Sequence, residues 1–383
     1  MLALRRRVLL SGIALAALVA VAVTVVNAAA GQRGVPGPLT RATRSVPADS
    51  FVSLVPACAC SRRTWLAAFS LQNGQRLKTF LSVDTNEQPQ LSTPAADDHH
   101  QLYFTKTAGA QCAVSNYMEC PRYVPDSCVN TVLDFSPGDT TLPTAFTIPG
   151  SLMLGAAVPD PGGSRIALTL SPCTSLNGTT GLFVRTLATG QTRPVFTTVF
   201  TTGNTCDQFL QPAWSASGRR IAFVFDRSRG RPKPSVGPEC ASESVQRVAV
   251  VRSDGGSEHS GPLLLAPDPG CVFGAAAFDR LGIVAMEGCQ QGHPGWQPPD
   301  GYVYLKQFSS AGAFIRRVRI GIGLDGSEMA SVPHTGSVLA TLNQGANEPW
   351  PERDWVSEFN GAQLRPIAHY KAWDANQIDA VAW

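Results

Sequence analysis

The residues with the clearest chemical potential in this chain of 383 residues are ten cysteines. Cysteines can pair as disulfides or bind zinc as thiolates, and an even count permits complete pairing. Zinc sites use close ligand pairs such as C-x-x-C, whereas the tightest pair here is Cys58 and Cys60 in "CAC". The spacing therefore favours disulfides over zinc, and we expect no metal.

Motifs for the common catalytic chemistries are absent from the sequence. It contains no G-x-S-x-G nucleophile elbow, no P-loop Gly-Lys pair and no H-E-x-x-H motif. Of the six histidines only His99 and His100 are neighbours, and their context "ADDHH" is typical of a polar turn. Carboxylates from separate parts of the chain could still converge for acid/base catalysis. We assign no catalytic or cofactor-binding residue.

Composition and charge describe a folded chain with a large core. Hydrophobic residues make up 44% and charged residues 15% of the sequence. The net charge of +3 equals the contribution of Arg5, Arg6 and Arg7. The rest of the chain is neutral overall, so we expect no nucleic-acid partner, because that binding mode needs an excess of cations.

The N-terminus is typical of an export signal. Three arginines precede an apolar run from Val8 to about Ala30, which ends in "NAAAG". The run is long enough to span a bilayer, yet its end has the small residues of a signal-peptidase site. Residues 1–30 are therefore a cleaved signal peptide or a retained membrane anchor, and both place the remainder outside the cytoplasm. Residues 31–50, rich in Gly, Pro and Ser, predict a flexible linker.

From residue 51 to 383 the sequence repeats two kinds of hairpin. One kind is a short apolar strand, a polar turn and a β-rich strand, as in "GAAVPDPGGSRIALTL" and "PAWSASGRRIAFVFD". The other kind turns at a glycine, six times in all: Gly74, Gly138, Gly190, Gly255, Gly312 and Gly361. Two hairpins per repeat make a four-stranded antiparallel blade, so the fold class is all-β, a six-bladed β-propeller.

The ends of the repeat region predict how the ring closes. The segment "FVSLVP" resembles the second strand of a blade, and Ala380–Trp383 in "QIDAVAW" resembles a first strand. Pairing them completes blade 1 and removes exposed sheet edges.

The best-preserved repeat resembles a known family. "PAWSASGRRIAF" is similar to the P-x-W-S-P-D-G-x-x-I-A-F repeat of TolB-type, WD40-like propellers, and Asp160–Leu168 ("DPGGSRIAL") matches its turn and following strand. Ala216 and Ser217 replace the Pro-Asp of that pattern. The resemblance implies an exported propeller that binds other proteins of the cell envelope.

The two sets of connections in such a propeller emerge on opposite faces. Turns between first and second strands and between third and fourth strands form what we call the turn face, and they are short here. The other connections form the loop face; they are long, and all ten cysteines lie in or beside them. Nearly equal spacing in successive blades predicts two bridges, Cys173 with Cys206 and Cys240 with Cys271. The other six cysteines cannot be paired from sequence.

The predicted loop face also carries aromatic side chains, which suit a binding surface on a rigid scaffold. The candidates for partner binding are Tyr117, Tyr123, Trp296, Trp350 and Trp355. The alternative is that these rings pack the loops onto the blades. We thus predict a monomeric, non-enzymatic, extracytoplasmic propeller that binds a protein or other envelope component through the loop face. The alternative function is a secreted hydrolase or lyase with its site at the mouth of the central channel.

Overall fold

The computed structural model describes residues 47, 49–56, 63–84, 95–96, 101–108, 128–173, 178–200, 205–209, 212–229, 244–256, 262–289, 302–322, 324–332, 335–344 and 353–371. The predicted signal or anchor segment, 1–30, lies outside these residues. Within them, no helix has the length and hydropathy needed to cross a membrane.

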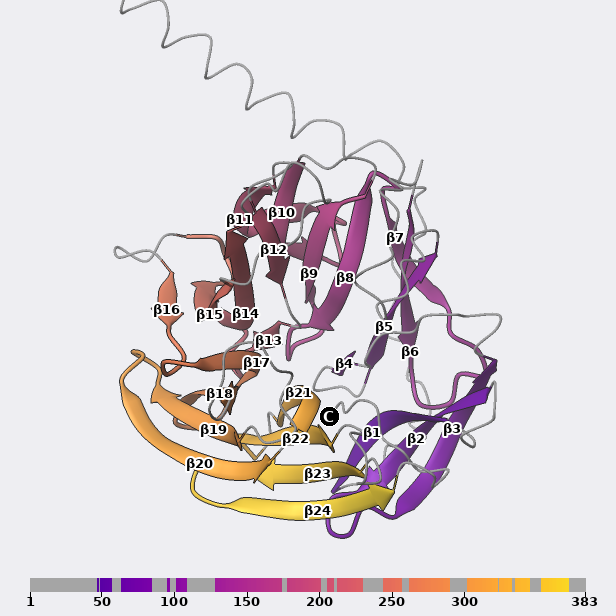
Figure 1. Ribbon diagram of the computed structural model, residues 1–383. Coiled ribbons are helices and arrows are strands. Elements are labelled where there is room, and N and C mark those ends of the chain that lie inside the picture. Colours follow the sequence, from indigo (N-terminus) through magenta and orange to yellow (C-terminus); the bar gives the residue numbers. More distant parts are fainter. Residues whose placement is uncertain are drawn as a thin grey trace, which may run out of the picture.

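The strands form six antiparallel sheets, which Figure 1 shows as blades arranged around a central axis. Blade 1 contains β1 (Ser50–Pro56), β2 (Arg63–Ser70) and β3 (Arg76–Asp84). Blade 2 contains β4 (Ala95–Ala96), β5 (Leu102–Ala108), β6 (Val129–Phe135) and β7 (Thr144–Ile148). Blade 3 contains β8 (Leu152–Pro159), β9 (Arg165–Pro172), β10 (Gly178–Thr186) and β11 (Thr192–Phe200).

The second half of the ring repeats the pattern. Blade 4 contains β12 (Thr205–Phe209), β13 (Ala213–Trp214), β14 (Arg220–Arg229), β15 (Ser244–Arg252) and β16 (Leu263–Leu265). Blade 5 contains β17 (Cys271–Phe278), β18 (Gly282–Cys289), β19 (Tyr302–Ser309) and β20 (Phe314–Ile322). Blade 6 contains β21 (Leu324–Val332), β22 (Ser337–Gln344), β23 (Arg353–Phe359) and β24 (Leu364–Lys371). The predicted all-β, six-bladed propeller is confirmed.

Glycine sets the hairpin turns as predicted. All six turn glycines have a positive φ, between 67° at Gly255 and 121° at Gly138. Residues with a side chain rarely adopt this left-handed backbone, so glycine is the least strained choice at these sites. The turn positions read from the sequence are therefore confirmed.

The hydrophobic core lies between blades rather than within one blade. In β14, Ile221, Phe223 and Phe225 pack against blade 3. Their neighbours Ala222 and Val224 point the opposite way and pack against blade 5. Because side chains alternate along a strand, a blade flanked on both sides needs apolar residues at every position of its inner strands.

The same packing closes the ring. Phe51, Val55 and Phe69 of blade 1 are fully buried in a cluster with Val332 and Leu339 of blade 6. Blade 1 has three strands within the described residues, in the order β1-β2-β3, so β1 lies at one edge of this sheet. The predicted closing strand, 380–383, lies outside the described residues and stays a prediction.

Blade 4 contains the best-preserved repeat, whose tryptophan and turn make defined contacts. Trp214 is buried, and its indole Nε1 donates a hydrogen bond of 2.9 Å to the carbonyl oxygen of Val158 in blade 3. The turn that follows is closed by the Gly218 amide, which donates to the carbonyl oxygen of Ser215 at 2.8 Å. This stretch is therefore architecture, and its tryptophan joins two blades.

One of the long connections predicted for the loop face, residues 201–210 between blades 3 and 4, is not entirely a loop. Thr205–Phe209 form β12, which pairs with the far end of β14. The aromatic side chain of Phe209 explains the extra strand, because its ring packs 5.8 Å from that of Phe223 and 5.2 Å from that of Phe225.

Candidate functional site

Four described cysteines lie on the loop face of the ring. Cys128 immediately precedes β6, Cys173 immediately follows β9, Cys271 begins β17 and Cys289 ends β18. Within their blades, Cys128 is at the start of a third strand and Cys271 at the start of a first strand. Cys173 and Cys289 are at the ends of second strands. In an up-and-down blade all these strand ends meet on the same face, so the loop-face position predicted for these four cysteines is confirmed.

The first disulfide joins two blades. Cys128 of blade 2 is bonded to Cys173 of blade 3, with Cα atoms 6.1 Å apart and a sequence separation of 45 residues. Both residues are buried, at 5% and 7% exposure. The Cys128 amide also donates to the carbonyl oxygen of Gly150 at 2.8 Å, which fixes the backbone beside the bridge.

The second disulfide lies within blade 5. Cys271 and Cys289 are directly opposite each other in the register of β17 and β18, with Cα atoms 4.1 Å apart. This bridge closes a sequence separation of 18 residues between strands that are already hydrogen-bonded neighbours.

The predicted pairing of the cysteines is therefore wrong. Cys173 was expected to bond Cys206 and Cys271 to bond Cys240, but their partners are Cys128 and Cys289. Equal spacing in successive blades indicates only that the two predicted pairs recur in the repeat, not that the two cysteines of a pair lie close together. A disulfide cannot join cysteines whose Cα atoms are more than about 7 Å apart, and the structure brings the described cysteines this close only where strand ends touch.

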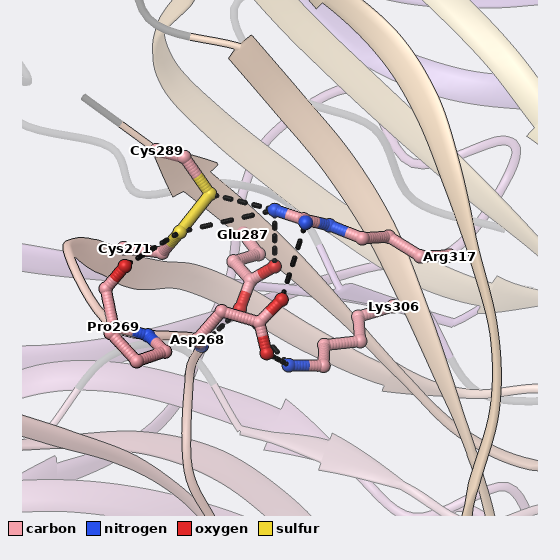
Figure 2. Close-up of a disulfide and its surroundings, with 7 residues drawn as sticks. All are labelled: Asp268, Pro269, Cys271, Glu287, Cys289, Lys306 and Arg317. Atoms are coloured by element: carbon pink, nitrogen blue, oxygen red, sulfur yellow. Dashed lines mark hydrogen bonds and ion pairs between the residues drawn. A yellow bond between two sulfur atoms is a disulfide. The ribbon is translucent and has the colours of Figure 1, made fainter. Parts of the chain in front are cut away.

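An ion-pair network lies directly beside the second disulfide (Figure 2). The Glu287 side chain is fully buried and the Lys306 side chain is 8% exposed, and their Oε1 and Nζ atoms are 3.2 Å apart. The Lys306 ammonium also donates to the carboxylate of Asp268, whose backbone amide donates to Glu287 at 2.7 Å. Buried charges persist only when paired in this way.

Arg317 links this network to the sulfur atoms. Its Nη1 is 3.2 Å from a carboxylate oxygen of Asp268, and its Nη2 is 3.0 Å from one of Glu287. The same Nη2 donates to Sγ of Cys289 at 2.8 Å and lies 3.8 Å from Sγ of Cys271. The ring of Tyr304 supports the guanidinium, with 3.5 Å from Cζ to the ring centroid.

The geometry favours a disulfide over a metal centre here. Both sulfurs and a carboxylate oxygen of Glu287 lie within 4.8 Å of one another, a set that free thiols could use to bind a cation. The two sulfurs are bonded to each other, however, and Glu287 contacts two cationic side chains. Those cations would repel a metal ion.

The other predicted site residues are only partly described. Cys206 lies in β12, and Trp355 lies in β23 rather than in a loop. The remaining candidates lie outside the described residues: Tyr117, Tyr123, Cys240, Trp296 and Trp350. Their grouping on the loop face stays a prediction.

The turn face carries a groove of about 720 Å³ between blades 3, 4 and 5. Five arginines and two aspartates contribute to its lining: Arg165, Arg219, Arg220, Arg252, Arg280, Asp254 and Asp279. Two of the arginines link neighbouring blades, since Arg165 donates to the Gly218 carbonyl at 2.7 Å and Arg220 to the Ser310 carbonyl at 2.7 Å. Arg219 and Arg280 are exposed.

One carboxylate of this groove has a perturbed acidity. The guanidinium of Arg252 donates to the side chain of Asp254 and holds the pKa of that carboxyl well below its ordinary value. A second donor, the amide of Gly256, acts in the same direction. Asp254 is therefore charged at neutral pH and suited to pairing rather than to proton transfer.

The charged partners of the second disulfide are not among the site residues predicted from the sequence. Glu287 in "GIVAMEGC" and Lys306 in "YVYLKQFS" are single charges inside apolar strands. Such residues are rarely buried without a partner, so the pattern did contain a signal for an ion pair. It contained none for Asp268 or Arg317, which lie in segments where charges are ordinary.

Comparisons with known proteins give no family assignment. No protein-family model matches the chain, and no curated protein matches it. Among solved structures it is similar to prolyl oligopeptidase B from Galerina marginata, with 12% identity, a TM-score of 0.42 and coverage of 85% of this chain and 43% of that one. A similar likeness is found to an acylaminoacyl peptidase from Pyrococcus horikoshii, with 12% identity, a TM-score of 0.41 and coverage of 72% and 39%.

A third solved structure is a propeller domain by its own description. The β-propeller domain of the Trilobed protease from Pyrococcus furiosus is 10% identical, with a TM-score of 0.39 and coverage of 72% of this chain and 71% of that one. The chain spans less than half the length of the two peptidases above. Likenesses this low carry no argument about activity, and the propeller assignment depends on the strands and sheets themselves.

Proposed function

We propose that this chain is a non-enzymatic, extracytoplasmic propeller of the TolB type that binds a protein or other cell-envelope component through its loop face. The observation that carries the proposal is the covalent bridge between blades 2 and 3, Cys128–Cys173, at that face. A surface whose supporting blades cannot move apart presents its loops in a fixed arrangement, which lowers the ordering cost of binding.

The disulfides also support an extracytoplasmic location. Disulfides persist in oxidising compartments and are rare in the cytosol of most organisms. The predicted export signal in residues 1–30 agrees with this location, whether it is cleaved or kept as an anchor. We accordingly propose a protein that is secreted or held at the membrane by its N-terminus.

The chemistry of the described loop face favours binding over catalysis. Glu287 and Asp268 both contact Lys306 and Arg317, so their carboxylates are engaged in ion pairs. A general acid or base must reach a proton of the substrate, and these two carboxylates are instead held by their cationic partners. The alternative is a secreted hydrolase or lyase that works at the mouth of the central channel.

Capture experiments with face-specific variants test the proposal. The full chain would be cross-linked to an envelope extract as wild type, as Trp296→Ala with Trp350→Ala on the predicted loop face, and as Arg219→Ala with Arg280→Ala on the turn face. We expect the loop-face variant to lose at least about tenfold of the captured partner. The turn-face variant is the matched control and should keep it.

The opposite result would contradict the proposal. Loss of the partner in the turn-face variant alone would move the binding surface to the arginine-lined groove. Turnover of a peptide or glycan substrate by the wild type would favour the hydrolase or lyase.

A further inference from the structure

We propose that Cys271–Cys289 is an oxidising thiol–disulfide exchange site that takes an external dithiol as its reductant. The proposal goes beyond the binding function, because a scaffold needs no reactive disulfide. It depends on the position of one cation against the sulfurs, on the exposure of the bridge and on its contrast with Cys128–Cys173.

The position of Arg317 decides which sulfur leaves. Nη2 is 2.8 Å from Sγ of Cys289 and 3.8 Å from Sγ of Cys271. A cation in contact with a sulfur stabilises the thiolate that forms when the disulfide opens. Cys289 is therefore the better leaving group, and the external thiolate attacks Sγ of Cys271.

The charge of the surrounding network permits this stabilisation. Two cations, Lys306 and Arg317, balance two carboxylates, Asp268 and Glu287. The carboxylate of Glu287 opposes a new negative charge, since one of its oxygens lies within 4.8 Å of both sulfurs. The guanidinium is closer to Cys289 and donates to it directly, and both Lys306 and Arg317 offset Glu287, so attraction prevails.

The exchange balances in atoms and electrons. A thiolate of the dithiol bonds to Sγ of Cys271, the disulfide breaks, and its electron pair leaves on Sγ of Cys289 beside Arg317. The second thiolate of the dithiol then closes its own disulfide and releases the thiolate of Cys271, which takes a proton. The protein gains two electrons, the dithiol loses two, and the two dithiol protons pass to the cysteines or to solvent. Because the product thiolate is stabilised, the equilibrium shifts toward the reduced protein, and the bridge is a stronger oxidant than a disulfide without such a cation.

Solvent exposure favours thiol exchange at Cys271–Cys289 over exchange at Cys128–Cys173. Cys271 and Cys289 are partly exposed, whereas Cys128 and Cys173 are buried. The oxidised chain thus contains an internal reference: a bridge in the same molecule that an external dithiol reaches poorly.

Differential alkylation of the oxidised full chain tests the proposal. The probes are dithiothreitol and a reduced Cys-Xaa-Xaa-Cys peptide, and opened bridges are counted on tryptic peptides by mass spectrometry. We expect dithiothreitol to open Cys271–Cys289 at least about tenfold faster than Cys128–Cys173. Equal rates, or faster opening of Cys128–Cys173, would overturn the proposal. Reaction with the peptide as well marks the site as open to protein-borne dithiols, and reaction with dithiothreitol alone marks a site for small dithiols.

Three arginine variants isolate the role of the cation. Arg317→Met removes the sulfur contact and should slow opening of Cys271–Cys289 about tenfold. Arg319→Met is the matched control, because Arg319 lies two residues along β20 with its guanidinium 3.8 Å over the ring of Tyr302. It should leave the rate within about twofold, and Arg317→Lys should restore part of it. Equal slowing by both Met variants would contradict the role of Arg317.

A measurement on the wild type keeps the proposal falsifiable if Arg317→Met does not fold. In the reduced protein, the alkylation rate of Cys289 against pH gives the pKa of its thiol. We expect a pKa below the ordinary value of about 8.5. A pKa of the Cys289 thiol at or above this ordinary value would overturn the proposal, and this measurement needs no variant.

Discussion

The two described disulfides lie on the same face, yet they differ in burial, in the strands that they join and in their charged neighbours. Cys128–Cys173 is buried and joins two blades across a separation of 45 residues. Cys271–Cys289 joins neighbouring strands of one blade across 18 residues, and an arginine touches its sulfurs. We infer from this difference that Cys128–Cys173 holds neighbouring blades together, whereas Cys271–Cys289 is positioned for thiol–disulfide exchange.

The largest expected effect follows removal of the inter-blade bridge. Replacing Cys128→Ser and Cys173→Ser should lower the free energy of unfolding by about 4 kcal/mol, because the bridge closes a long loop of the unfolded chain. Urea unfolding under non-reducing conditions measures it. A loss under about 1 kcal/mol would show that Cys128–Cys173 is not the structural member of the pair.

Removal of the intra-blade bridge should have a smaller effect. Cys271→Ser with Cys289→Ser should cost about 3 kcal/mol or less, since the closed loop is shorter. β17 and β18 stay paired through their backbone in this variant. The same urea titration applies, and a loss larger than that of the first variant would reverse the comparison.

Removal of a non-covalent link between blades should lower the free energy of unfolding less than removal of either disulfide. Arg165 bonds to Asp160 at 2.9 Å in its own blade and to Gly218 and Ser253 in blade 4. Arg165→Met should lower the free energy of unfolding by about 2 kcal/mol, because the buried Asp160 carboxylate loses its charged donor and the Gly218 carbonyl keeps only the hydroxyl of Ser253. The variant should not change the reduction rate of either disulfide. A change in that rate would mean that blade contacts, not local charge, control sulfur reactivity.

The smallest effect is expected at an exposed charge of the turn face. Arg252 holds the pKa of Asp254 below its ordinary value, so the charged carboxylate adds stability that is complete above about pH 4 and is lost as pH falls through the lowered pKa. Asp254→Asn should cost less than about 0.5 kcal/mol at pH 7, because the pair is exposed. The difference from wild type should disappear in acid. A larger loss of stability at pH 7, measured by thermal unfolding, would show that this exposed ion pair contributes substantially to the free energy of unfolding.

The fold was predictable from the sequence because its signals are local. Glycine at the hairpin turns and the short apolar strands beside them each depend on residues only a few positions apart. The extra strand β12 was missed, because the aromatic contacts of Phe209 that stabilise it come from other strands of blades 3 and 4.

The site was predictable only in part because its contacts are non-local. The face that carries the cysteines follows from strand order, but the partner of each cysteine depends on which strand ends touch. Arg317 lies in β20 and Asp268 in the connection between β16 and β17, and they meet at Glu287 only after the strands pair. No spacing in the sequence encodes that meeting.

A tryptic peptide map of the oxidised chain tests the comparison of the two disulfides most directly. Each relevant cysteine falls on its own peptide: 123–165 for Cys128, 166–185 for Cys173, 186–219 for Cys206, 230–247 for Cys240, 253–280 for Cys271 and 281–306 for Cys289. The structure predicts that 123–165 is linked to 166–185 and that 253–280 is linked to 281–306. Linkage of 166–185 to 186–219, or of 230–247 to 253–280, would contradict it.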